Sequence, residues 1–87
     1  MYFVIVYDIG VERVNNICKY LKQHLNWVQN SVFEGELTEG EFEEVKARLN
    51  KLIDKSSDSL LIYSTLSENY LQKMALGTEK APISRII

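Results

Sequence analysis

The apolar run Tyr2-Phe3-Val4-Ile5-Val6-Tyr7, which stops at Asp8, is the feature that most constrains the fold of this chain. β-Branched and aromatic residues favour strands, and a run without polar alternation is typical of a strand covered on both faces. The run lacks a basic segment before it and ends at a carboxylate, so it predicts neither a signal peptide nor a membrane span. We therefore expect a central strand with Asp8 at its end.

The size and composition of the chain predict one globular domain over residues 1–87. With 87 residues, 46% hydrophobic and 25% charged, the chain lies near the lower size limit for a self-sufficient core, and association with a second copy would add stability. The lone Cys18 excludes an internal disulfide, and one His leaves no Cys/His cluster for zinc. We expect a soluble, cytoplasmic protein that uses no membrane, with Cys18 in the core.

The formal net charge of −2 argues weakly against nucleic acid as a partner, but the charges are segregated along the chain. No acid lies between Arg13 and Phe33. Six glutamates and no base lie from Glu34 to Glu44, and four bases and one acid lie from Lys46 to Lys55. The acidic total therefore leaves room for a local positive face.

Two helices are predicted from apolar spacing. A first stripe predicts a helix from Glu12 to Leu25, and a second follows the capping box formed by Thr38 and Glu41. The two stripes consist of Val14, Ile17, Cys18, Leu21 and Leu25, and of Phe42, Val45, Leu49, Leu52 and Ile53. Acids at the start of the second helix and bases later in it suit the helix dipole.

A hairpin is predicted between the helices. Trp27–Gln29 and 32–37 have strand character, and Asn30 between them tolerates the positive φ of a two-residue turn. One long strand with a bulge is the alternative. Gly35 inside the second strand marks a bulge or a close approach of backbones.

A last strand is predicted from Ser59 to Leu66, after a turn at residues 55–58, and a short helical turn is expected from Leu71 to Leu76. The order strand, helix, strand, strand, helix, strand predicts a ferredoxin-like α+β fold, in which two helices cover one face of a four-stranded antiparallel sheet. The apolar tail at residues 81–87 is either a frayed terminus or a fifth strand on the sheet edge of a second protomer.

Asp8 is the candidate functional residue. It either caps the first helix or forms a turn, or it binds a hard cation, since a carboxylate at the end of an apolar strand is costly if buried and unpaired. Mg²⁺ prefers oxygen ligands, keeps several waters and often uses one or two carboxylates. One Asp is a poor site, whereas two copies across a two-fold axis would share one Mg²⁺ in a better one.

These residues carry a family resemblance. The chain resembles the CRISPR-associated protein 2 family, the small adaptation proteins of prokaryotic CRISPR systems, over nearly its whole length. The resemblance rests on Tyr7-Asp8-Ile9 closing the first strand, Arg13 opening the first helix, and Val28-Gln29-Asn30-Ser31-Val32-Phe33-Glu34-Gly35.

The resemblance implies a ferredoxin-like homodimer in which residues from about 80 to 87 cross to the sheet of the partner. It also implies assembly with the CRISPR integrase during spacer acquisition, in which the dimer bridges DNA through backbone contacts. Members are described as metal-dependent endonucleases acting on RNA or duplex DNA, which implies Mg²⁺ as cofactor.

Residue by residue, Asp8 matches the catalytic, metal-binding aspartate of the family. Tyr7, Arg13, Ser31 and Phe33 match positions around the cleft and are expected to bind substrate.

Two positions depart from the family pattern, which often has further arginines in the first helix and before the Gln of the second strand. Here Val14, Asn15 and Asn16 follow Arg13, and Trp27 precedes Val28. Fewer cations neutralise fewer phosphates, which weakens the expectation of autonomous binding or cleavage of nucleic acid. Trp27 is expected in the core or an interface rather than stacked on a base.

Two alternatives to a nuclease remain. The protein could be a non-catalytic structural subunit that bridges DNA for the integrase, with Asp8 as a turn residue. It could also be a ferredoxin-like module that senses small molecules, although the chain lacks a glycine-rich loop after the first strand.

Overall fold

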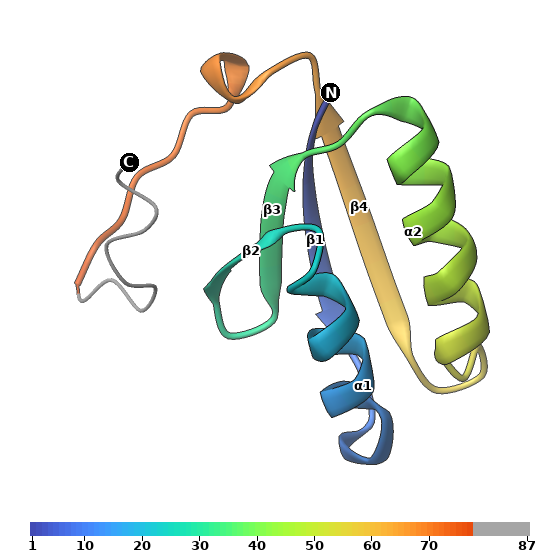
Figure 1. Cartoon of the computed structure of the whole chain (residues 1–87). Coiled ribbons are helices and arrows are strands. Elements are labelled where there is room, and N and C mark those ends of the chain that lie inside the picture. The colour runs from blue at the N-terminus through green and yellow to red at the C-terminus, as the bar shows by residue number, and fades with distance from the viewer. Residues whose placement is uncertain (78–87) are drawn as a thin grey trace.

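The computed structural model describes residues 1–77 and has the predicted ferredoxin-like α+β fold (Figure 1). Its four strands form one antiparallel sheet in the order β2-β3-β1-β4, and both helices cover the same face of it. The elements are β1 (Tyr2–Asp8), α1 (Val11–Leu21), β2 (Asn26–Gln29), β3 (Val32–Glu36), α2 (Glu39–Leu52), β4 (Ser59–Thr65) and the 3₁₀ helix η1 (Glu68–Tyr70). The predicted tail strand at 81–87 lies outside the described residues.

The strand β1 is central, as the apolar run predicts. It is hydrogen-bonded to β3 on one side and to β4 on the other, so that Val4 lies opposite Glu34 and also opposite Tyr63. The helices cover one face of the sheet, and of the strand residues on the other face only Tyr2 and Glu34 are buried within residues 1–77. We call the other face the open face; β1, β3 and β4 contribute to it Tyr2, Val4, Val6, Asp8, Val32, Glu34, Glu36, Ser59, Leu61, Tyr63 and Thr65.

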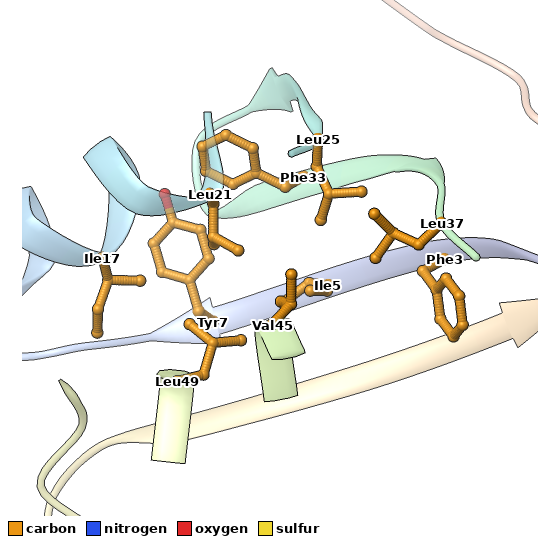
Figure 2. Close-up of a cluster of buried hydrophobic side chains, with 10 residues drawn as sticks. All are labelled: Phe3, Ile5, Tyr7, Ile17, Leu21, Leu25, Phe33, Leu37, Val45 and Leu49. Carbon is orange, nitrogen blue, oxygen red and sulfur yellow. The ribbon is translucent and has the colours of Figure 1, made fainter. Parts of the chain in front are cut away.

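The core lies between the sheet and the helices (Figure 2). Successive side chains of a strand point to opposite faces, so every second residue of β1 points towards the helices. There they meet the apolar stripes of α1 and α2, whose spacing predicted these contacts. The cluster consists of Phe3, Ile5, Tyr7, Ile17, Leu21, Leu25, Phe33, Leu37, Val45 and Leu49.

The hairpin between β2 and β3 is confirmed, with Asn30 in the left-handed region at φ 40°. The irregularity of this ladder lies between Trp27 and Gln29 rather than at Gly35. Gly35 instead allows a close approach, since a Cβ there would lie 3.0 Å from Leu25 Cδ2. Trp27 is half-buried against the core, as expected, and its indole Nε1 donates to the Asn30 carbonyl at 3.0 Å.

Two predicted helical segments differ from the structure. α1 ends at Leu21 rather than Leu25, because the chain tightens there: the amide of His24 donates to the carbonyl of Leu21 at 3.0 Å. Leu25 is still buried in the core, as its apolar spacing predicted, although it lies beyond the end of α1.

The predicted helical turn at Leu71 to Leu76 is absent, and η1 lies just before it. Met74 and Leu76 are 86% and 88% exposed, so within residues 1–77 no core packs on this segment to stabilise a turn. The segment is tied to the open face at another point, where Lys73 forms an ion pair with the buried Glu34. The hydroxyl of Tyr2 donates to the same carboxylate at 2.9 Å.

The capping box of α2 is confirmed. The amide of Glu41 donates to Thr38 Oγ1 at 3.1 Å, and the amide of Thr38 donates to Glu41 Oε1 at 2.8 Å. The hydrogen bond from the Thr38 backbone lowers the pKa of the Glu41 carboxyl, because it stabilises the ionised form.

No helix within residues 1–77 is long and apolar enough to span a bilayer.

We predict that Thr38→Ala destabilises the protein by about 1 kcal/mol, because the replacement leaves an amide of the first helical turn without its acceptor. The matched control Thr38→Ser keeps the hydroxyl and should retain most of the stability. Urea unfolding followed by circular dichroism measures both. Equal stability of the Ala and Ser variants would contradict a contribution from the cap.

Candidate active site

Three segments far apart in sequence meet at the end of β1 that carries Asp8. Asp8 lies opposite Ser59, the first residue of β4. On the other side of β1, the amide of Tyr7 donates to the carbonyl of Ser31 at 3.0 Å. The end of β1, the β2–β3 turn and the start of β4 therefore form one rim of the sheet.

Asp8 is exposed at this rim, at the end of the open face. The interpretation of Asp8 as a helix cap is wrong, because the N-cap of α1 is Gly10 and α1 has no side-chain cap. Its carboxylate has no hydrogen bond or ion pair with any residue from 1 to 77. Asp8 is thus an exposed carboxylate that is available to a ligand.

Tyr7 and Phe33 lie on the opposite face from Asp8, within the core. Phe33 is 0% exposed, and the ring of Tyr7 stacks on it with centroids 6.0 Å apart. The Tyr7 hydroxyl lies 3.1 Å from the half-buried Cys18 Sγ. Burial, with a smaller effect of Cys18, raises the pKa of Tyr7. Both rings therefore support the rim from inside, and their direct contact with substrate stays a prediction.

Ser31 is half-buried in the β2–β3 turn, next to the positive-φ residue Asn30. Its carbonyl is the acceptor that ties this turn to β1. Of the predicted substrate-binding residues, Ser31 is the one whose backbone fixes the turn beside the Asp8 end of β1.

Arg13 is held by Asp58, a residue that the sequence interpretation placed only in a turn. Arg13 Nη2 donates to Asp58 Oδ1 at 2.7 Å, and Arg13 Nε donates to Oδ2. The amides of Gly10 and Asp54 donate to the same carboxylate at 2.9 and 2.8 Å. We call this group of Gly10, Arg13, Asp54 and Asp58 the Asp58 clasp.

The side chain of Asp58 is 0% exposed, yet it is ionised. Hydrogen bonds from Arg13, together with those from the Asp54 and Gly10 amides, hold the pKa of Asp58 well below its usual range. Reciprocally, Asp58 raises the pKa of Arg13. In the sequence, the one sign of this role of Asp58 was its place as an acid directly between a polar turn and an apolar strand.

The remaining contacts of Arg13 are with Glu12, whose Oε1 lies 3.0 Å from Nη1, and with Ser57. Because Asp58 already binds two of its nitrogens, Arg13 has less of its guanidinium available for a phosphate. Its predicted role in substrate binding is not tested by these contacts.

The donor set at the rim fits half of a magnesium site. No group of three or more His, Cys, Asp or Glu gathers anywhere in residues 1–77. The oxygens of Asp58 are occupied by four donors, Glu12 pairs with Arg13, and Asp54 accepts from Ser56, which leaves Asp8 as an exposed carboxylate at the rim. One exposed carboxylate with waters is a donor set that Mg²⁺ accepts, and a second copy of the chain would supply a second carboxylate.

The fold and the rim define a small ferredoxin-like protein with one exposed carboxylate at the end of its central strand. The family model described as CRISPR associated protein Cas2 matches residues 1–74. The chain belongs to this family, which confirms the resemblance seen in its motifs.

Relatives and solved structures agree with this assignment. The chain is 58% identical to the CRISPR-associated endoribonuclease Cas2 of Pyrococcus furiosus and 56% identical to that of Methanosarcina acetivorans, over 100% of each chain. A structure titled "Crystal structure of cas2" matches with a TM-score of 0.87 at 43% identity, covering 95% of this chain and 93% of that one. Streptococcus pyogenes Cas2 at pH 6.5 matches with a TM-score of 0.73 at 31% identity, covering 86% of this chain and 100% of that one.

We predict that Asp58→Asn weakens the acid dependence of stability. An aspartate in an unfolded chain has a pKa of about 3.9. The folded-state pKa of Asp58 is lower than this unfolded-state value. The ionised Asp58 therefore stabilises the fold fully above the unfolded-state pKa, and this stabilisation is lost as the pH falls from about 5 towards 1.

The free energy of unfolding of the wild type should therefore fall over this range, and that of the variant should be lower at pH 7 and fall less. Urea titrations at a series of pH values measure this. If the free energy of unfolding of the variant depends on pH as steeply as that of the wild type, Asp58 is not the group whose protonation destabilises the fold.

Proposed function

We propose that this chain is a CRISPR adaptation protein of spacer acquisition that acts as a homodimer with Mg²⁺-dependent endonuclease activity on RNA or DNA. The observation that carries the proposal is Asp8, an exposed carboxylate without an intrachain partner in residues 1–77, at the end of the central strand. The curated relatives carry the name endoribonuclease, which supports a phosphodiester as substrate.

The open face supports the homodimer. Its middle is apolar, with Val4 and Val6 opposite Tyr63 and Leu61, which are 59% and 57% exposed. A small domain gains stability by covering such a surface, and a two-fold interface is self-complementary. Face-to-face packing of two copies would cover these residues and bring the two rims that carry Asp8 onto one interface.

The edge of β4 supports exchange of the tail. Within residues 1–77, β4 pairs with β1 alone, so the backbone groups along its outer edge have no strand partner. Such an edge is a template for a further strand. In our proposal the segment at about 80–87 of one chain, which lies outside the described residues, pairs with β4 of the other.

The site would work through oxygen ligands and electrostatic stabilisation. Asp8 from each chain would hold one Mg²⁺, which when bound polarises a phosphate and lowers the pKa of a bound water. Ser31 and Arg13 would contact the substrate backbone, with Arg13 Nη1 exchanging its contact with the exposed Glu12 for a phosphate oxygen. Tyr7 and Phe33 keep the rim rigid from within the core.

A non-catalytic bridge is the second candidate function. It is favoured by the absence of any group of three or more His, Cys, Asp or Glu within residues 1–77 and by the net charge of −2. In this case the dimer would position DNA for the CRISPR integrase subunit, and Asp8 would play no chemical part.

We predict that Asp8→Asn reduces Mg²⁺-dependent cleavage of RNA or duplex DNA to background while the protein stays folded, because Asn lacks the negative charge that holds the cation. Glu44→Gln, which neutralises an exposed acid on α2, is the matched control and should keep wild-type activity. Gel assays with and without chelator measure cleavage. Full metal-dependent activity in Asp8→Asn would exclude the catalytic role.

Spacer integration with the integrase subunit separates the two candidates in the same variants. Loss of integration in Asp8→Asn alone supports a chemical role. Wild-type integration by a variant that no longer cleaves supports the bridge.

We predict that Leu61→Lys shifts the protein from dimer to monomer, because a charge placed on the apolar open face would be desolvated in the interface. Ala47→Lys, at an exposed position of α2, is the control and should remain dimeric. Sedimentation velocity over a concentration series measures both. A Leu61→Lys variant as dimeric as the control would place the interface elsewhere.

A further inference from the structure

The Asp58 clasp is a buried ionic group that the proposed chemistry does not use. Asp58 Oδ1 accepts from the Gly10 amide and Arg13 Nη2, and Oδ2 accepts from Arg13 Nε and the Asp54 amide. Four donors on one carboxylate fix it in direction as well as in position, because each bond restricts the orientation of the group.

The clasp holds the chain immediately after Asp8. Residue 8 is fixed on one side by its pairing with Ser59. Two residues later, the Gly10 amide is fixed by Asp58, the neighbour of Ser59, at 2.9 Å. The connection from β1 to α1 is thus anchored to the start of β4 at two successive points.

This anchoring matters for Asp8 because its own side chain makes no polar contact with residues 1–77. A catalytic carboxylate is commonly oriented by hydrogen bonds of its own. Here the position of the Asp8 carboxylate depends on the backbone at residues 8–10, and hence on what holds that backbone.

Gly10 is adapted to the clasp by its size. Its φ of −58° and ψ of 146° are open to any residue, so no left-handed conformation demands a glycine. A Cβ there would lie 2.6 Å from Arg13 Nη2. The same Cβ would lie closer still to Glu12 Oε1, so a side chain at position 10 would force the ends of Arg13 and Glu12 to shift.

We propose that Asp58 and Arg13 are positioning residues, which fix the β1–α1 connection so that Asp8 is presented to a divalent cation. The inference rests on the proposed function, in which Asp8 is the ligand. Stability alone does not call for such a group, because apolar side chains of similar volume often stabilise a fold as well as a buried ion pair does. A bidentate pair adds defined geometry, which a ligand needs.

The test uses the full chain and Mn²⁺ as the probe, with binding measured by electron paramagnetic resonance of the free ion. Asp8→Asn gives the reference for loss of the ligand. Asp58→Asn and Arg13→Lys should weaken Mn²⁺ binding about tenfold or more, the usual effect of removing a group that orients a metal ligand. Glu43→Gln, which breaks the exposed Glu43–Lys46 pair on α2, is the control and should bind as the wild type does.

Gly10→Ala crowds the ends of Arg13 and Glu12 without removing a charge, and it is the second variant if Asp58→Asn does not fold. It should weaken Mn²⁺ binding in the same direction. In ¹⁵N relaxation measurements, it should also raise the mobility of residues 8–10 while β3 stays rigid. Wild-type Mn²⁺ affinity and unchanged mobility in folded variants that lack the clasp would overturn the proposal.

The two proposals fail in distinguishable ways. If Asp8→Asn binds Mn²⁺ as tightly as the wild type, the proposed metal role of Asp8 is wrong, and the relaxation data alone decide whether the clasp positions residues 8–10. If Asp8→Asn loses binding and the clasp variants keep it, the metal role stands and the positioning role is wrong.

Discussion

The pairing of β1 on both sides is the constraint on which the rest of the molecule depends. Because β1 is hydrogen-bonded to β3 and β4 at once, its register places two later segments relative to residue 8. The β2–β3 turn reaches Tyr7 through the carbonyl of Ser31, and the start of β4 reaches Asp8 through Ser59. A rim made from distant parts of the sequence is therefore a direct result of one strand being central.

Local patterns predicted most of the fold because the physics behind them is local. Apolar spacing, the Thr38–Glu41 capping box and the turn at Asn30 depend on residues a few positions apart, and the structure confirms all three elements. The end of α1 and the absent turn after Tyr70 were mispredicted because tertiary packing decides them. Leu25 is buried without being helical, whereas Met74 has no core to pack on within residues 1–77.

The candidate site was predictable only in part. Asp8 stands out in sequence because a carboxylate ends an apolar run, and the motif around it indicated the family. Asp58 could not be paired with Arg13, because 45 residues separate them and only the sheet topology brings them together. That Tyr7 and Phe33 belong to the core follows from strand alternation, but only once the helices are known to cover their face.

Two consecutive residues of β1, Tyr7 and Asp8, differ in what limits their replacement. Tyr7 is limited by the volume and polarity of a closed core, where its ring meets Phe33 and Cys18. Asp8, one residue later, is exposed, so no packing within residues 1–77 limits its side chain. A designer or natural variation can therefore change the rim carboxylate with little effect on the folding of the single chain, and can repack the core beneath it without altering the proposed ligand. Stability and the proposed chemistry are thus separable within a single dipeptide.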